Sequence, residues 1–125
     1  MVAELVDSSV LVDILRGYPD AQAWFNQQPV LYITRITWIE VIQGARDKIA
    51  QQRSLKLMRR FGIIELDATD ITMAADLMLN WRLKLNIDLG DCLLCATVMR
   101  LKLPFYTRNL KHFSPILGTL ASSPY

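Results

Sequence analysis

The stretch ELVDSSVLVDILRG, residues 4–17, decides the fold of this chain. Its apolar start, up to Val6, suits a β-strand, and Asp7 follows directly with two serines behind it. Apolar residues then recur at helical spacing until Gly17 ends the pattern. The stretch therefore predicts a strand that turns into a helix, with the carboxylate of Asp7 at the turn. In an open α/β sheet, ligands bind outside the carboxyl ends of the strands, so Asp7 is a candidate functional residue.

An aspartate at such a turn also has an ordinary structural role. Asp and Ser are preferred helix N-caps, so Asp7, Ser8 or Ser9 can serve only to start the helix. For one such acid in isolation, capping is the more common role. A functional role gains weight because oxygen-bearing side chains recur at similar junctions further along the chain.

Length and composition suit one domain, residues 1–125, with ample material for a core. Hydrophobic residues make up 52% of the chain and charged residues 21%, which argues against disorder. The net charge of +2 is too small to indicate a nucleic-acid binder from composition alone. Two cysteines and one histidine leave little for a disulfide framework or a zinc site. Because no signal peptide or transmembrane stretch is recognisable, we expect a cytoplasmic protein with no membrane partner.

Strand patterns and helix patterns alternate along the chain. This alternation predicts the α/β class, with a parallel sheet and right-handed crossovers. The predicted strands are 2–6, 30–33, 63–66, 103–106 and a weak final strand near 116–120, preceded by a short turn. The predicted helices are 9–16, a short helix from residue 19 that ends before residue 29, 34–45, 48–61, 69–85 and 88–102.

Glu40 lies in an otherwise apolar helical segment. If the helix begins at Thr37, Thr37 and Glu40 form a capping box. If it begins at Thr34, an equally good cap, Glu40 lies inside the helix and has no capping role. A glutamate between Trp38 and Val41 is costly to desolvate unless it is paired or bound to a cation.

Asp88 and Asp91 open the most apolar predicted helix. Asp88 suits the N-cap, and Asp91 suits the first turn, where it complements the helix dipole. Nothing acidic follows in that helix, so Asp91 is the last charge before an apolar run. Asn109 follows a strand that ends at Thr107, where asparagine is an ordinary turn residue.

These oxygen-bearing side chains fall at or near strand-to-helix junctions, which share one edge of a parallel sheet. Carboxylates a few ångströms apart raise each other's pKa unless a cation neutralises them. Oxygen ligands suit Mg²⁺ or Mn²⁺ rather than Zn²⁺. The sequence therefore predicts a site for Mg²⁺ (or Mn²⁺) at this edge. The residues concerned are Asp7, Glu40, Asp91 and Asn109.

Taken in order, these segments resemble the motifs of a PIN domain, and the short chain resembles the VapC toxins of type II toxin–antitoxin systems. The resemblance implies a three-layer α/β/α fold with a central, mainly parallel sheet of four to five short strands. It implies Asp7, Glu40 and Asp91 as metal ligands that form the catalytic set together with Asn109. The hydroxyls of Ser9 and Thr107 support this set. The matching segments are 5–13, residue 40, 91–97 and 107–113.

The same resemblance implies a metal-dependent endoribonuclease that acts as the toxin of a toxin–antitoxin pair. It would hydrolyse RNA phosphodiester bonds with a metal-activated water. The implied partners are RNA, a cognate antitoxin protein and a second copy of the chain in a homodimer. Asn109 and His112 depart from the family, because many relatives carry Asp at these positions. The missing fourth acid motivates an alternative: a catalytically weakened PIN-like binding module that docks RNA or a protein partner.

Basic residues that closely follow the motifs are the candidates for contact with RNA: Arg16, Arg108 and Lys111. A second basic group lies between two core segments, and it either contacts phosphates or forms a solvated helix face. Its members are Arg46, Lys48, Arg53, Lys56, Arg59 and Arg60.

Other chemistries have less support. Cys92 and Cys95 form a C-x-x-C, but inside an apolar helix we expect small buried hydrophobic side chains rather than a redox pair. A Ser-His-Asp arrangement would need His112 as its base and is recognised by geometry, not by sequence. A phosphoacceptor receiver domain also clusters acids at strand ends. It requires two adjacent acids after the first strand, and Asp7-Ser8 does not match.

Overall fold

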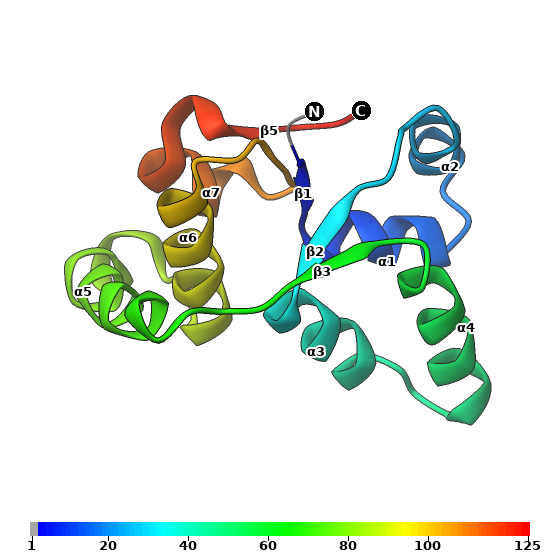
Figure 1. Cartoon of the computed structure of the whole chain (residues 1–125), viewed down its shortest axis with the longest axis horizontal. Coiled ribbons are helices and arrows are strands. Elements are labelled where there is room, and N and C mark those ends of the chain that lie inside the picture. The colour runs from blue at the N-terminus through cyan, green and yellow to red at the C-terminus, as the bar shows by residue number, and fades with distance from the viewer. Residues whose placement is uncertain (1–2) are drawn as a thin grey trace.

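The computed structural model describes residues 3–125, which form an α/β structure (Figure 1). Its strands are β1 (Leu5–Val6), β2 (Tyr32–Thr34), β3 (Gly62–Ile64), β4 (Phe105–Tyr106) and β5 (Ala121–Ser122). The α-helices of the described residues are α1 (Ser8–Leu15), α2 (Pro19–Asn26), α3 (Arg35–Gln43), α4 (Lys48–Met58), α5 (Ala68–Leu85), α6 (Leu89–Leu101) and α7 (Leu110–Leu117). A 3₁₀ turn, η1 (Gly118–Leu120), joins α7 to β5.

The five strands form one sheet in the order β3-β2-β1-β4-β5, and every pair is parallel. Leu5 pairs with Tyr32 on one side and Phe105 on the other, so β1 is the central strand. Because all strands run the same way, their carboxyl ends lie along one edge. The predicted α/β class and parallel sheet are confirmed.

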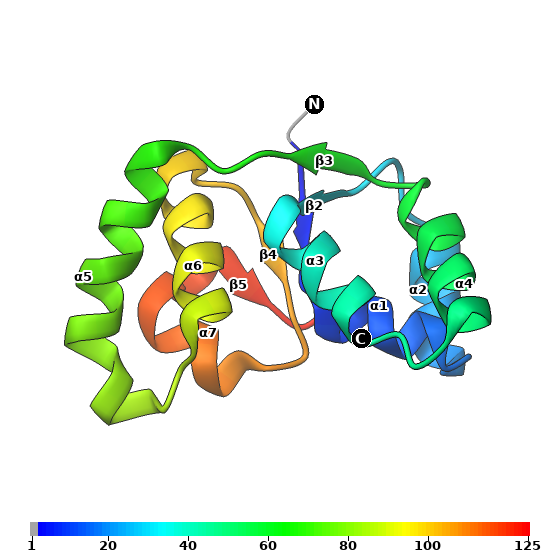
Figure 2. The same cartoon turned by 90° about the horizontal axis from the view of Figure 1, so that it is seen from below.

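Helices cover both faces of the sheet, and each face has its own buried cluster. Leu5 and Val6, adjacent in β1, point to opposite faces and belong to different clusters. The first cluster draws its helical residues from α5, α6 and α7, and the second draws them from α1 to α4. Figures 1 and 2 show these two groups of helices on opposite sides of the strands. The predicted three-layer arrangement is therefore present.

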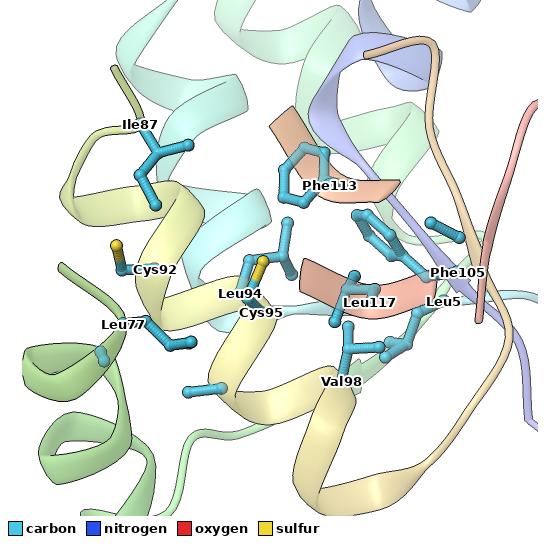
Figure 3. Close-up of a cluster of buried hydrophobic side chains, with 13 residues drawn as sticks. Leu5, Leu77, Ile87, Cys92, Leu94, Cys95, Val98, Phe105, Phe113 and Leu117 are labelled. Carbon is cyan, nitrogen blue, oxygen red and sulfur yellow. The ribbon is translucent and has the colours of Figure 1, made fainter. Parts of the chain in front are cut away.

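The cluster around α6 contains both cysteines. Cys92 and Cys95 are buried and free, among apolar neighbours such as Ile87, Leu94 and Val98 (Figure 3). Burial raises the pKa of both thiols, which suppresses the reactive thiolate. The interpretation of this C-x-x-C as small hydrophobic core residues is confirmed.

The chain after Thr107 differs from the sequence prediction. A full helix, α7, follows where a short turn was expected, and the last strand lies at Ala121–Ser122 rather than near 116–120. The reason is packing, because Phe113 and Leu117 lie about one turn apart on α7 and both join the α6 cluster. The Phe113 ring meets Phe105 edge-on, with ring centroids 5.0 Å apart.

One glycine is required by a close approach between strands. A Cβ at Gly62, the first residue of β3, would lie 2.2 Å from the ring of Tyr32 on the adjacent strand. Among the helices of residues 3–125, none has the length and apolarity needed to cross a membrane.

Candidate active site

Asp7 lies at the carboxyl end of the central strand and is 5% exposed. Its Oδ1 accepts a hydrogen bond of 2.8 Å from the Ser8 amide. Asp7 therefore caps α1, which is the ordinary structural role expected of an aspartate at this turn. Its Oδ2 accepts two further hydrogen bonds, each 2.8 Å long, from the hydroxyls of Ser9 and Thr107. Three donors, two in the turn after β1 and one directly after β4, therefore fix one carboxylate orientation, and no cationic side chain of residues 3–125 takes part.

Ser9 and Thr107 connect this carboxylate to the loop that precedes α7. The Thr107 hydroxyl accepts a hydrogen bond from the Asn109 amide (2.9 Å), and the Ser9 hydroxyl accepts one from the Arg108 amide (3.1 Å). Both predicted supporting residues thus contact Asp7 directly and hold the loop that carries Asn109 next to it.

Glu40 reaches the site from α3, which lies between α1 and α6 (Figure 2). Thr34 is the N-cap of α3, and its hydroxyl accepts a hydrogen bond from the Thr37 amide (3.2 Å). Glu40 is therefore inside the helix and has no capping role. Its Oε2 lies only 2.8 Å from where a Cβ at Gly90 would be, so the glycine in the first turn of α6 makes room for it.

Asp91 stands in the first turn of α6 and forms a capping box with Asp88. The Asp91 amide donates to Asp88 Oδ1 (2.9 Å), and Asp91 Oδ2 accepts a longer contact of 3.4 Å from the Asp88 amide. The same Oδ2 lies 3.2 Å from Nδ1 of His112 on α7. The structural interpretation of this pair is confirmed, and one Asp91 oxygen stays outside the box.

The electrostatics of these acids follow from burial and from their proximity. Burial raises the pKa of Asp7 despite its hydrogen bonds. Burial, followed by the charges of Asp7, Asp88 and Asp91, raises the pKa of Glu40 to about 7. Burial and the charge of Asp88 also raise the pKa of Asp91. The acids expected at one edge are therefore close enough to repel one another.

The donor set suits a hard divalent cation in its chemistry. Asp7, Glu40 and Asp91 offer carboxylate oxygens whose mutual repulsion a divalent cation would remove. As they stand, no three His, Cys, Asp or Glu side chains within residues 3–125 converge closely enough to hold an ion.

Comparison with known proteins identifies the family. The model of the PIN domain matches residues 5–114, a span that includes each of the acids described above and Asn109.

The chain belongs to the PIN domain family.

Proteins similar to this PIN domain include a ribonuclease and a chain of a toxin–antitoxin complex. Ribonuclease VapC10 of Mycobacterium tuberculosis is 33% identical over 114 residues, which cover 87% of this chain and 84% of the relative. A toxin–antitoxin complex from Klebsiella pneumoniae contains a chain that is 30% identical, with a TM-score of 0.73 and 98% of each chain covered. The DNA-bound VapBC of Salmonella typhimurium shares the fold at 20% identity, with a TM-score of 0.79 over the whole of both chains.

The basic candidates occupy different environments in this PIN domain. Arg16 and Lys111 are exposed at the end of α1 and the start of α7. Arg108 is held by the C-terminal segment, because its guanidinium lies 4.4 Å from the ring centroid of Tyr125 and donates to the Tyr125 carbonyl. It also lies 3.8 Å from Asp13 Oδ2, which accepts a 2.7 Å hydrogen bond from the Tyr125 hydroxyl. Arg108 is thus engaged within the chain, unlike the other two.

Sequence reasoning missed two features of the site. Nothing assigned a role to Gly90, although a glycine between two acids in the first turn of a helix is a signal of close approach. It also left open what His112 does, and the structure places it against Asp91. Asn109 occupies the N-cap of α7, and its side chain makes no capping hydrogen bond there.

Proposed function

We propose that this PIN domain is a divalent-metal-dependent endoribonuclease and the toxin of a toxin–antitoxin pair. One observation carries the proposal: Asp7, Glu40 and Asp91 lie together at the carboxyl edge of the sheet with raised pKa values. A bound Mg²⁺ or Mn²⁺ would act there as a Lewis acid toward the phosphodiester and lower the pKa of water. The 33% identity to ribonuclease VapC10 supports the same reaction.

Each side chain has a distinct part in this proposal. Asp7 is the fixed member, because Ser9, Thr107 and the start of α1 hold both of its oxygens. Burial and the neighbouring acids raise the pKa of Glu40 to about 7, and a bound divalent cation would favour its ionised form. Asp91 supplies the third carboxylate from the start of α6.

Asn109 contributes a neutral amide where many relatives carry a fourth acid. Held at the N-cap of α7 by the bond from its amide to Thr107, it is placed to orient the phosphodiester or the attacking water by hydrogen bonding. A neutral residue here weakens any second cation site.

The proposed partners are RNA, a cognate antitoxin and a second copy of this chain. The Klebsiella relative, solved in a toxin–antitoxin complex, supports the antitoxin. The homodimer is supported by an apolar row on the outer face of α5, at one-turn spacing, where Leu79 and Leu83 are 83% and 98% exposed.

The test is a cleavage assay with purified, antitoxin-free protein and total cellular RNA. Wild type is assayed with Mg²⁺, with Mn²⁺ and with EDTA, beside two variants. Asp7→Asn removes one charge from the site. Glu65→Gln is the matched control, because Glu65 follows β3 near the same edge but is exposed and paired with Arg35. We expect discrete cleavage that EDTA and Asp7→Asn abolish and that Glu65→Gln retains. Cleavage that survives EDTA or Asp7→Asn would overturn the proposal.

A second candidate function, the binding module, rests on Asn109 alone. It predicts a folded wild-type chain that binds RNA or a protein partner and does not cut RNA with either metal. Asn109→Asp would then be the informative variant, since it restores the acid that many relatives carry.

A further inference from the structure

A pocket of about 370 Å³ lies between α1, α3 and α4, and the chemistry described above does not use it. Glu40 and Val41 form its wall on α3, so it opens directly beside the acids. Its remaining apolar lining includes Val12 and Leu15 of α1 and Ala50 of α4. We refer to it as the α1–α3–α4 pocket.

Three arginines line this pocket and give it a cationic rim: Arg16 at the end of α1, Arg46 before α4, and Arg53 on α4. The guanidinium of Arg53 donates a 2.9 Å hydrogen bond to the Leu15 carbonyl, which fixes it across the gap between the two helices. Asp47 also lines the pocket, but its Oδ1 already accepts the Ala50 amide (2.8 Å) as the N-cap of α4. The lining therefore carries three arginines against two acids, the capping Asp47 and Glu40.

We propose that the α1–α3–α4 pocket binds the nucleotide of the RNA strand adjacent to the phosphodiester that is cut. This inference rests on the proposed nuclease function and adds a subsite to it. Its volume lies in the range of ordinary ligand pockets, about 300–1,000 Å³. The apolar lining suits an unstacked base or ribose, and the arginine rim suits the phosphates on either side of it.

The position of Glu40 favours an RNA strand over a protein segment as the occupant. Glu40 belongs to the proposed metal site and also lines the pocket, so an RNA strand that is cut at this site continues past Glu40. Phosphates then follow at every nucleotide, and the three arginines that line the pocket offer them positive charge. Single-stranded RNA is also commonly bound by splayed bases together with arginine contacts to the backbone.

The experiment measures RNA binding separately from cleavage. Every protein carries Asp7→Asn, which prevents cutting, and the probe is a short fluorescent single-stranded RNA of mixed sequence followed by anisotropy. One protein adds Arg16→Gln and Arg46→Gln, two exposed arginines of the rim. The charge-matched control adds Lys56→Gln and Arg59→Gln, which are exposed on or just after α4 and lie outside the pocket. Thermal unfolding checks that all of the proteins are folded.

We expect the pocket pair to weaken RNA binding about 10-fold or more. It should also reduce the slope of log K against log salt by about 1.4, that is, about 0.7 for each lost phosphate contact with a single strand. The control pair should change affinity by less than about 3-fold, since solvated charges act only through the general field.

Two outcomes would overturn the inference. An equal loss in both pairs would reduce the effect to net charge, and unchanged RNA binding in the pocket pair would assign the pocket to a protein segment instead. Failure of the nuclease proposal is seen elsewhere, in wild type that does not cut RNA with Mg²⁺ or Mn²⁺. A wild type that cuts, together with pocket variants that bind RNA normally, would refute the subsite alone.

Discussion

Helices α5 and α6 begin with the same sequence device and reach opposite electrostatic states. Asp67 and Asp70 cap α5 as Asp88 and Asp91 cap α6, with the second acid of each pair turned back to the first amide. In α5, Asp70 is 1% exposed, and Arg100 donates to both of its oxygens. Burial alone would raise the pKa of Asp70, but Arg100, the Asp67 amide and Thr97 together lower it.

Asp91 has no guanidinium partner in the described structure. Its neighbours are Asp88, Asp7 and the single histidine, and burial and the charge of Asp88 raise its pKa. Asp70 on α5 and Arg100 on α6 form an ion pair that joins the two helices. A buried acid with a cationic partner inside the protein thus has a structural role. Buried acids without such a guanidinium partner are destabilised in their charged form unless a cation from outside the protein neutralises them. The comparison thus separates a structural acid from a candidate metal ligand by its partner and not by its motif.

The largest expected effect is on cleavage by Asp91→Asn. The substitution keeps the shape of the capping box but removes one carboxylate from the proposed cation site, so we expect a loss of about 100-fold or more in RNA cleavage. The free energy of unfolding should stay the same or rise, because burial and the charge of Asp88 disfavour the charge that is removed. Cleavage rates and urea unfolding measure the two effects, and retained cleavage would remove Asp91 from the catalytic set.

Asp70→Asn is expected to lower stability and leave RNA cleavage unchanged, which is the reverse of Asp91→Asn. It leaves the partly exposed Arg100 without its carboxylate, so we expect the free energy of unfolding to fall by about 2–3 kcal/mol. Cleavage per folded molecule should be unchanged, since Asp70 lies outside the acid cluster. Urea unfolding followed by circular dichroism gives the first quantity. A specific loss of cleavage in the folded variant would break the distinction between the two helices.

Gly90→Ala should give a smaller loss of activity, about 10-fold. The added Cβ would fall 2.8 Å from Glu40 Oε2 and displace that flexible carboxylate, while alanine suits the helix better than glycine. Stability should therefore hold or improve while cleavage falls. In a Glu40→Gln background the same substitution should have little further effect on cleavage, and additive losses would show that Gly90 acts by another route.

The last expected effect concerns the pH dependence of stability in metal-free protein. The pKa of Glu40 rises from 4.5 to about 7 on folding, so its stabilising contribution is complete below about pH 4.5 and is lost as the pH rises through about 7. In the presence of a chelator, the free energy of unfolding of the wild type should therefore fall between about pH 5 and pH 8. Glu40→Gln should show a shallower decline over the same range, as measured by urea unfolding at each pH. Identical pH profiles of the two proteins would show that the surroundings of Glu40 do not raise its pKa.

The sequence was sufficient for the features that depend on local spacing. Asp7 at the strand-to-helix turn and the parallel alternation follow from neighbouring residues. The sequence offered Thr34 and Thr37 as equally good caps, and the structure decides for Thr34, which places Glu40 inside α3. It could not show which Asp-x-x-Asp pair meets an arginine, because Asp70 and Arg100 are 30 residues apart and meet only when α5 packs on α6.

The remaining differences also have tertiary causes. The α7 helix depends on Phe113 packing against Phe105, which local hydrophobicity near residues 116–120 did not reveal. The engagement of Arg108 by Tyr125 joins residues that are 17 apart and separated by a helix.

Calorimetric titration of Mn²⁺ into metal-free protein tests the central claim most directly. We predict that wild type and Asp70→Asn bind Mn²⁺ with similar affinity, and that Asp91→Asn binds about 10-fold more weakly or not at all. No Mn²⁺ binding by folded wild type, or equal binding by wild type and Asp91→Asn, would contradict the claim that this edge of the sheet is a metal site.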